Sequence, residues 1–306
     1  MAVNPIQISA LVPVAFGGGD LLQNVINLGN YGTNDVDVII PGAQPADQNA
    51  PLPVNPVITF DTNPMPWNKN PLDRNDLLAP PVIPPNATFT NRNKLLTMLK
   101  LFQVAAVDRV NVTFQVSCVG TTVYYLDGPL GDPPGPMMGP MGPLRGGDRG
   151  YGIPFEERVS TNATAHLEKY FVFHSYSLLG ATELVVRSEV DCVNAVPEIT
   201  EIKAKRATDA NTAYYQTVWW QMFFGRTQSL LRGLHQPNPP GRRVRFTSIT
   251  AHTFAAVGLL ALMDDPTATP PLESLVALIQ WIRGQIADGE SKTFTFTAFS
   301  QECAMT

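Results

Sequence analysis

The sequence predicts a mainly β protein, an antiparallel sandwich or barrel with a few inserted helices. Three observations support this class. The chain of 306 residues holds 28 prolines and 23 glycines, more than average but fewer than in low-complexity chains. Several short segments alternate apolar and polar residues, as strands with one buried face do. The order of segments also lacks a regular strand–helix alternation, which favours antiparallel sheets.

The first half shows short strands between long proline-rich loops. Proline cannot donate a ladder hydrogen bond, so the stretches 41–56 and 63–85 are expected to be loops or extended arms. Residues 94–104 place Leu95, Leu96, Leu99 and Phe102 on one side of a predicted helix. The strands expected in this half are 6–14, 36–40, 57–60, 109–119 and 121–126.

The second half is more regular. Helices are predicted over 209–233 and 272–287, the second preceded by Pro270-Pro271 and followed by Gly289. The segment 293–299, TFTFTAF, mostly alternates threonine and phenylalanine, which is typical of a strand with one buried face. The strands expected in this half are 167–176, 183–193, 199–204, 243–254 and 292–299.

A glycine- and proline-rich segment from Gly128 to Gly152 separates the halves. Its glycines do not recur strictly at every third position, so it is not a collagen-like triple helix. We expect a long exposed loop or linker. The predicted division is therefore a β-rich region with extended loops at 1–127, the loop or linker at 128–154, and a β-rich domain with two helices at 155–306.

Charge is sparse and unevenly distributed. Only 15% of the residues are charged, and the net charge is -5. No lysine or arginine precedes Lys69, whereas residues 201–250 hold eight basic and two acidic side chains. Such a basic region attracts phosphate groups of nucleic acid or lipid headgroups. The alternatives are a solvated face or arginines that pair with carboxylates of a neighbouring subunit.

The cysteine spacing and the hydropathy of the sequence exclude further classes of protein. The three cysteines, Cys118, Cys192 and Cys303, are far apart and lack ligand spacing, so neither a disulfide framework nor a zinc site is predicted. The longest apolar run, 249–263, is too short to span a bilayer as a helix. The chain is therefore not expected to be transmembrane.

The sequence contains no motif that specifies catalysis. No nucleophile elbow, phosphate-binding loop or HExxH pattern is present. The strongest polar candidate is a cluster of His166, Glu168 and His174 on one strand face, although a histidine that is simply exposed or hydrogen-bonded is commoner. We therefore predict no catalytic residue, no metal site and no cofactor.

An aromatic cluster on the predicted helix 209–233 suggests an interface. Its rings would wrap more than half of the helix, so the helix is either buried on both sides within one subunit or contacts a second subunit or a membrane. The interface candidates are Trp219, Trp220, Phe223 and Phe224 with the nearby arginines Arg242, Arg243 and Arg245.

The sequence resembles jelly-roll major capsid proteins of icosahedral viruses. The stretches RVNVTFQVSCVGTTVYYL, GRRVRFTSITAHTF and SKTFTFTAF carry the resemblance, together with the low charge and the proline-rich loops. It is similar in style to capsid proteins of membrane-containing bacteriophages, because the first 68 residues lack a basic arm for neutralising a genome. The resemblance implies one decorated jelly roll or two in tandem.

The function implied is therefore structural, not enzymatic: self-assembly into a virus shell. The expected partners are other copies in capsomers, other virion proteins and internal membrane headgroups, without sequence-specific nucleic-acid binding. The expected location is the virion, after synthesis in the host cytoplasm. One alternative is a β-sandwich binding module or adhesin that recognises carbohydrate or protein. The other is an enzyme with a scattered site around His166, Glu168 and His174.

Overall fold

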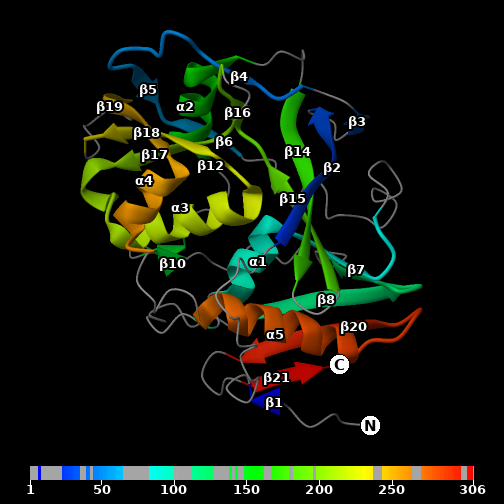
Figure 1. The fold of residues 1–306 in the computed structure, drawn as a ribbon. Helices are drawn as coiled ribbons and strands as arrows, with labels where there is room; N and C mark the ends of the chain where they lie inside the picture. Colours follow the sequence, from blue (N-terminus) through cyan, green and yellow to red (C-terminus); the bar gives the residue numbers. More distant parts are fainter. Residues whose placement is uncertain are drawn as a thin grey trace.

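The fold consists of two mixed β-sheets connected by a layer of helices (Figure 1). It is described from a computed structural model that covers residues 6–7, 23–34, 39–41, 44–64, 83–99, 102, 112–126, 138–139, 142–143, 148–161, 167–178, 182–195, 198–236, 243–263, 270–297 and 302–305.

The larger sheet has ten strands within these residues. In spatial order they are β1 (Ile6–Gln7), β21 (Glu302–Met305), β20 (Ser291–Thr297), β8 (Val112–Val119), β9 (Thr122–Leu126), β7 (Ala87–Asn91), β15 (Thr182–Glu189), β14 (Leu167–Leu178), β2 (Gln23–Asn34) and β3 (Ile39–Pro41). Strand β7 is parallel to both of its neighbours, and the other pairs are antiparallel.

The smaller sheet has seven strands in the same described residues. Their order is β13 (Ser160–Thr161), β4 (Asp47–Gln48), β16 (Cys192–Val193), β17 (Ile199–Arg206), β18 (Ser229–His235), β19 (Arg243–Thr253) and β5 (Val57–Thr59). Two short pairs stand apart: β10 (Met138–Gly139) with β11 (Gly142–Pro143), and β12 (Asp148–Gly150) with β6 (Asp61–Pro64).

The described helices lie on and between the two sheets (Figure 1). They are α1 (Arg92–Leu99), α2 (Gly152–Val159), α3 (Thr212–Gly225), α4 (Phe254–Ala261) and α5 (Pro270–Gly284), with a short 3₁₀ turn η4 (Ala207–Asp209). Within the described residues, none of these helices is long and apolar enough to cross a membrane.

The predicted jelly roll is wrong. A jelly roll is an antiparallel arrangement of two Greek keys, whereas here β7 pairs in parallel with β9 and β15, and β17 pairs in parallel with β18. Parallel neighbours require a crossover connection, and α3 provides one by leading from β17 to β18. The fold is therefore a mixed α/β architecture, neither one decorated jelly roll nor two in tandem.

Most predicted strands of the second half exist, but the helix predicted at 209–233 is too long. Helix α3 ends at Gly225 because Arg226 adopts a left-handed conformation, with φ of 52°, and strand β18 follows. Two further helices were not predicted. Helix α2 lies at the end of the segment expected to be a linker, and α4 ends the strand expected over 243–254.

The predicted division of the chain is not tested by the structure. Much of the segment 128–154 lies outside the described residues, as does most of the predicted strand 6–14. The boundaries at 127 and 154 therefore stay predictions.

Helix α3 connects the two halves of the molecule through its packing. Near its C-terminus, Trp220 and Phe224 join the main core under the larger sheet, with α1, α5 and the phenylalanines of β8 and β20. Its Tyr215, Val218 and Met222 pack with Leu230 of β18 and with α4. The same helix thus contacts both sheets, and it fixes the place where they meet.

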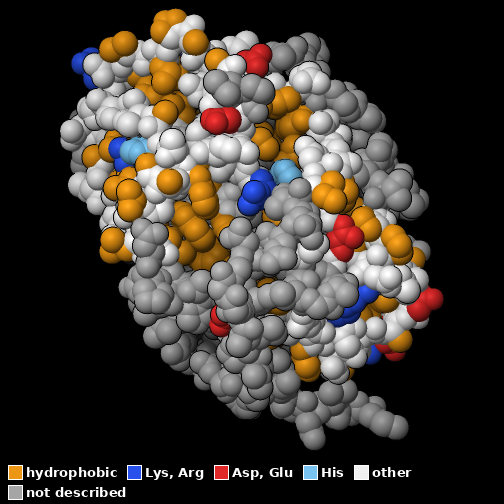
Figure 2. All heavy atoms as spheres, in the orientation of Figure 1, with side chains coloured by type: hydrophobic (Ala, Val, Ile, Leu, Met, Phe, Trp, Pro, Cys, Tyr) orange, Lys and Arg blue, Asp and Glu red, His pale blue; other side chains and the backbone are white. Residues whose placement is uncertain are grey.

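The surface agrees with the low charge of the sequence. On the face drawn in Figure 2, charged side chains are few and lie scattered among hydrophobic and uncharged ones. The large exposed apolar side chains of α4 and the residue after it are Leu259, Leu260 and Leu262.

Candidate active site

Two short patterns bring charged side chains together where the chain passes from the larger to the smaller sheet. They are Glu189-Val190-Asp191 at the end of β15 and Glu201-Ile202-Lys203 in β17. In β17, successive residues point to opposite sides and Ile202 is buried, so Glu201 and Lys203 share one side. Asp191 lies two residues beyond the end of β15, after the buried Val190, and its contact with Lys203 places it on that same side.

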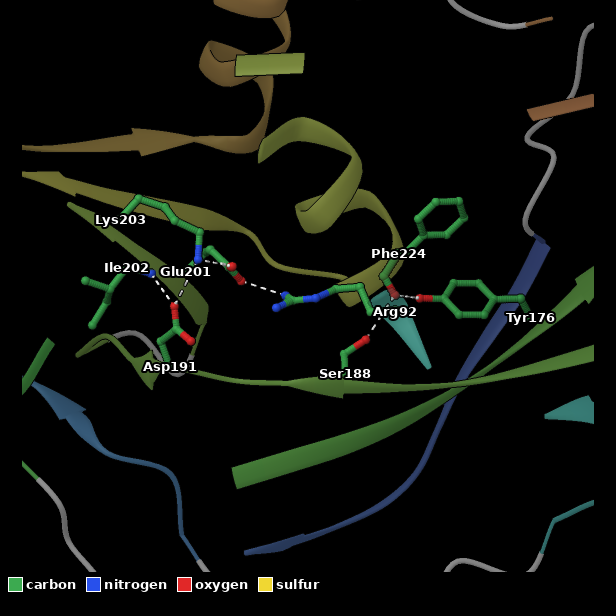
Figure 3. A network of polar contacts seen from close by, with 8 residues as sticks. All are labelled: Arg92, Tyr176, Ser188, Asp191, Glu201, Ile202, Lys203 and Phe224. Carbon is green, nitrogen blue, oxygen red and sulfur yellow. Dashed lines mark hydrogen bonds and ion pairs between the residues drawn. The ribbon is translucent and has the colours of Figure 1, made fainter. Parts of the chain in front are cut away.

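Glu201 is the centre of a buried polar network (Figure 3). Its Oε2 lies 2.7 Å from Nη1 of Arg92, and its Oε1 lies 2.5 Å from Nζ of Lys203. The same ammonium lies 3.8 Å from Oδ2 of Asp191. Two cations and two carboxylates thus form one connected cluster.

Asp191 is positioned by a backbone N–H of β17 that lies beyond the pairing of β17 with β16. Strand β16 pairs with β17 only at Thr200 and Ile199, so the backbone N–H of Ile202 lies beyond that ladder. Asp191 accepts a hydrogen bond from this N–H at 2.6 Å. The carboxylate is therefore held at the edge of β17, on the side facing Lys203.

Arg92 is fixed by two helices. It is the first residue of α1, and the preceding Asn91 accepts a hydrogen bond from the backbone N–H of Lys94. On the other side, its guanidinium packs against Gly225, the last residue of α3. A β-carbon at position 225 would lie 3.3 Å from Nη1 of Arg92.

The C-terminus of α3 is in turn attached to the larger sheet. The carbonyl oxygen of Phe224 accepts a hydrogen bond from the hydroxyl of Tyr176 at 2.7 Å and from that of Ser188 at 3.4 Å (Figure 3). Tyr176 belongs to β14 and Ser188 to β15. The larger sheet thus positions Arg92 through helix α3.

Electrostatics keep Glu201 ionised. Burial alone would raise the pKa of this carboxyl, but Arg92 and Lys203 outweigh it and lower the pKa to about 2. For Lys203 and Arg92, burial would lower the pKa, but Glu201 and Asp191 outweigh it and raise both values. These three groups are therefore charged at neutral pH.

Two further carboxyls have pKa values above their ordinary range. Burial, together with the negative charge of Glu201, raises the pKa of Asp191 to about 7. Burial and the charge of Asp191 raise the pKa of Glu156, in α2, well above its ordinary range, and Glu189 contributes to both shifts. Four carboxylates thus lie near two cations and repel one another when ionised.

This donor set fits a divalent cation chemically. Carboxylate oxygens are the ligands that Mg²⁺ and Mn²⁺ prefer. Burial is the largest cause of the raised pKa values of Asp191 and Glu156, and the negative charges of neighbouring carboxylates add to it. In the described residues, no three such side chains already converge on one point. Glu201 does not turn toward the other carboxylates because Arg92 and Lys203 already engage its two oxygens.

His174, which belongs to the polar candidate weighed from the sequence, makes no described hydrogen bond or ion pair with this network. His174 lies in β14, buried, with its Nδ1 lacking a hydrogen-bond partner in the described part of the chain. Burial and Arg226 lower its pKa to about 4. His166 and the side chain of Glu168 lie outside the described residues.

The aromatic interface candidates divide by burial. Trp220 and Phe224 are buried in the core of the chain itself, whereas Trp219 and Phe223 are half-buried and stack on each other with ring centroids 5.1 Å apart. Their role at an interface stays a prediction.

The arginine candidates are exposed where they are described. Arg243 and Arg245 lie in β19 beside β5, and Arg242 lies outside the described residues. No described contact connects them with the acidic cluster. Their predicted interface role is likewise untested.

Comparison with solved structures reveals the fold. Rai1 of Scheffersomyces stipitis, in complex with (3′-NADP)⁺ and a calcium ion, matches with a TM-score of 0.73 and 13% identity over 99% of this chain and 93% of that one. The chain has the Rai1 fold. Candida albicans Rai1 in complex with pU5 and Mn²⁺ matches with a TM-score of 0.68 and 11% identity over 100% and 93% of the two chains.

A third neighbour is a variant of S. pombe Rai1 with three glutamate substitutions, in complex with 3′-FADP. It matches with a TM-score of 0.67 and 11% identity over 99% of this chain and 98% of that one. No protein-family model and no curated protein matches the sequence.

These neighbours overturn the capsid prediction. Rai1 proteins are RNA-processing enzymes, and nothing in the comparisons indicates a viral shell, a bacteriophage or an adhesin. The expected capsomer, virion and lipid partners and the virion location are therefore wrong. The predictions that the chain is not an enzyme and that it has no sequence-specific nucleic-acid binding are overturned as well, because the neighbours are RNA-processing enzymes solved with nucleotide and RNA ligands.

The sequence carried only a weak signal for the cluster. Each pattern has a charged, an apolar and a charged residue, and the apolar residue is buried. The same alternation occurs at Arg243-Val244-Arg245 of β19, whose Val244 is also buried, so it does not distinguish the cluster from an ordinary half-buried strand. No local motif connects these patterns with Arg92 or Glu156, which only the fold brings close.

Proposed function

We propose that this protein is a metal-dependent phosphohydrolase that acts on the end of an RNA or on nucleotides joined through phosphate. The observation that carries the proposal is the group of four carboxylates, Glu156, Glu189, Asp191 and Glu201, beside Arg92 and Lys203. In the reaction, water adds to phosphorus while a phosphorus–oxygen bond breaks. The products are a phosphate ester and the alcohol or phosphate of the leaving part.

A divalent cation would be held by Glu156, Glu189 and Asp191, with Glu201 as a further oxygen donor. Bound there, the metal would stabilise negative charge on the reacting phosphate and lower the pKa of a bound water molecule. The cluster suits this task because its carboxylates already raise one another's pKa, and a positive charge would relieve that repulsion.

The two cations of the cluster have different tasks. Lys203 is 28% exposed, so its ammonium is accessible to a phosphate oxygen of the substrate. Arg92 is 8% exposed and bonded to Glu201. It therefore acts as a positioning residue that keeps Glu201 ionised and oriented.

Asp191 is held in place for its part in binding the cation. One of its oxygens accepts the N–H of Ile202. The hydrogen bond fixes the orientation of the carboxylate at the strand edge.

The neighbours support the class of substrate. They were solved with pU5, (3′-NADP)⁺ and 3′-FADP, and with calcium or manganese ions. The S. pombe variant carries substitutions at three glutamates, and three glutamates belong to the cluster of this chain. An acidic, metal-binding site for phosphate-linked nucleotides is consistent with both facts.

The proposal is tested by incubating the protein with RNA oligonucleotides that carry a 5′-triphosphate, a 5′-monophosphate or a dinucleotide cap, and with free dinucleotides. Reactions contain Mg²⁺ or Mn²⁺, and products are separated by chromatography and identified by mass. We expect cleavage of at least one substrate, which stops when EDTA is added. Isothermal titration calorimetry with Mn²⁺ alone should show binding that Asp191→Asn weakens at least about tenfold.

A matched pair of variants assigns the activity to the cluster. Glu156→Gln should reduce kcat/KM at least about 100-fold. Glu157→Gln removes the same charge from an exposed neighbouring position of α2 and should leave kcat/KM within twofold. The proposal fails if no substrate is cleaved with either metal and Mn²⁺ does not bind.

A further inference from the structure

Strand β17 extends the charged side of the cluster by one more lysine. Glu201, Lys203 and Lys205 occupy alternate positions of the strand and therefore share one side. Two residues of a strand span roughly 6–7 Å. This is about the separation of adjacent phosphates in an extended nucleotide chain, so Lys205 lies one such step from Lys203.

Lys205 lines an open groove that lies beyond the cluster. The groove has a volume of about 450 Å³ and is bounded by β17, the turn η4 and the first turns of α3. This volume falls in the range of small-molecule sites. The ammonium of Lys205 lies 5.3 Å from the centre of the Tyr214 ring, which holds it by a cation–π contact.

The charge of Lys205 is not neutralised as that of Lys203 is. Lys203 contacts both Glu201 and Asp191, whereas none of the ion pairs in the described residues includes Lys205. Asp209 lies on the groove wall, where its carboxylate accepts a hydrogen bond from the Thr208 hydroxyl. Lys205 is therefore available to an anion from outside the chain.

Tyr214 connects the groove with a second cation that none of the ion pairs in the described residues includes. Arg232 lies opposite Lys203 in the register of β17 and β18, and its guanidinium stacks over Tyr215. Burial raises the pKa of Tyr214 to about 12, the charges of Lys203 and Arg232 act to lower it, and the charge of Glu201 acts to raise it.

Tyr214 and Arg232 also have hydrogen-bonding atoms without partners in the described residues. The hydroxyl oxygen of Tyr214 and Nε of Arg232 are buried and lack hydrogen-bond partners in the described part of the chain. Buried polar atoms of this kind are usually satisfied by protein, water or a ligand. With Lys205, they make the surroundings of Tyr214 electropositive, with donors that an anion would satisfy.

We propose that the groove at the start of α3 binds the second phosphate of the substrate, next to the phosphate held at the acidic cluster, and that Lys205 is its main contact. This inference rests on the proposed function, because it assumes that the first phosphate is bound beside Lys203. If the groove binds a second phosphate, the substrate is a chain of at least two phosphate-linked nucleotides. The groove would then favour such a chain over a mononucleotide.

The test compares the binding of uridine oligonucleotides that carry a 5′-phosphate and are one or three nucleotides long. Binding is measured by competition in fluorescence anisotropy with Ca²⁺ as the metal. Lys205→Gln should weaken the trinucleotide roughly 3- to 10-fold, as expected for one lost phosphate contact. It should leave the mononucleotide within twofold. The slope of log affinity against log salt concentration for the trinucleotide should fall by about 0.7.

Arg206→Gln is the matched control. Arg206 follows Lys205 in the same strand, is exposed and points to the other side of the sheet. Arg206→Gln removes the same charge, and it should change the affinity for the mononucleotide and for the trinucleotide by no more than twofold. Tyr214→Phe keeps the ring but removes the hydroxyl, and it should weaken the trinucleotide more than the mononucleotide.

The outcomes separate the two proposals. If the wild type cleaves its substrates but Lys205→Gln behaves like Arg206→Gln, the groove assignment is wrong and the hydrolase assignment stands. If Lys205→Gln weakens the binding of the mononucleotide and the trinucleotide equally, the groove assignment is also wrong, because the lysine would then act on the first phosphate. If the wild type neither binds these oligonucleotides nor cleaves any substrate, both proposals fail.

Discussion

Arg92 and Glu201 form an ion pair whose atoms Nη1 and Oε2 are 2.7 Å apart and whose side chains are 8% and 1% exposed. Removing one member of such a buried pair leaves the other charge without its partner. The pair also connects the start of α1 with β17, and so the two sheets. Stability and catalysis are therefore coupled at this contact.

The first prediction concerns this pair. Arg92→Gln should lower the free energy of unfolding by about 2–4 kcal/mol, because Glu201 keeps only Lys203 as a counter-charge. Arg158→Gln, at an exposed position of α2, should change it by less than about 0.5 kcal/mol. Urea unfolding followed by circular dichroism measures both. Equal effects of the two substitutions would show that the buried pair does not stabilise the fold.

The second prediction uses a glycine at the end of α3. A β-carbon at position 225 would lie 3.1 Å from Oγ1 of Thr227 and 3.3 Å from Nη1 of Arg92, so Gly225→Ala should displace the guanidinium. We expect kcat/KM to fall at least about fivefold, since a small misplacement of a positioning group has a large kinetic effect.

Gly284→Ala is the control for this substitution. Gly284 is the last residue of α5, and a β-carbon there would meet no atom within 4 Å. The variant should keep full activity and gain up to about 0.5–1 kcal/mol of stability, because alanine favours the helix. If Gly225→Ala is as active as Gly284→Ala, Arg92 is not held by this contact.

The third prediction concerns pH and the sign of the Asp191 contribution. Its pKa is about 7 in the folded protein, against about 3.9 in an unfolded chain. Between these values the folded state binds more protons, so stability falls as pH rises toward 8. In EDTA, Asp191→Asn should therefore be more stable than the wild type at pH 8, by about 1–2 kcal/mol, and gain less at pH 5.

Other groups do not obscure this difference. The pKa of Glu201 is about 2, so its contribution is lost only when the pH falls below the range studied. His174, with a pKa of about 4, favours the folded state increasingly as pH rises to about 6.5, but it is present in both proteins and cancels. Glu156 acts in the same direction as Asp191. A gain that is independent of pH would contradict the raised pKa of Asp191.

The sequence predicted local structure better than topology or function. Alternation over the predicted strands 109–119 and 292–299 identified β8 and β20, because each has one face against the main core. Alternation alone does not determine which strands become neighbours. The parallel pairing of β17 with β18 depends on α3, and the predicted helix 209–233 merged α3 with β18.

The candidate site was missed for a related reason. Asp191 and Glu201 are ten residues apart, but Arg92 and Glu156 come from distant segments that only the fold brings near them. Composition also misled the interpretation. Low charge and many prolines are properties of an extended loop-rich chain, and they carry no information about a site of six residues.

The last prediction compares two buried tyrosines of the larger sheet. The hydroxyl of Tyr176 donates a hydrogen bond to the carbonyl of Phe224 at the end of α3. The hydroxyl of Tyr125 is also buried but has no hydrogen-bond partner in the described residues. Removing a satisfied hydroxyl costs a hydrogen bond and leaves the carbonyl short of a donor, whereas removing an unsatisfied one relieves a desolvation penalty.

Tyr176→Phe should therefore lower the free energy of unfolding by about 1–2 kcal/mol, while Tyr125→Phe should leave it unchanged or raise it. Because Phe224 precedes Gly225, against which Arg92 packs, Tyr176→Phe should also reduce kcat/KM, whereas Tyr125→Phe should not. Urea unfolding and steady-state kinetics on the same preparations measure the two effects. Loss of stability in Tyr176→Phe without any loss of activity would mean that the end of α3 supports the fold but does not position Arg92.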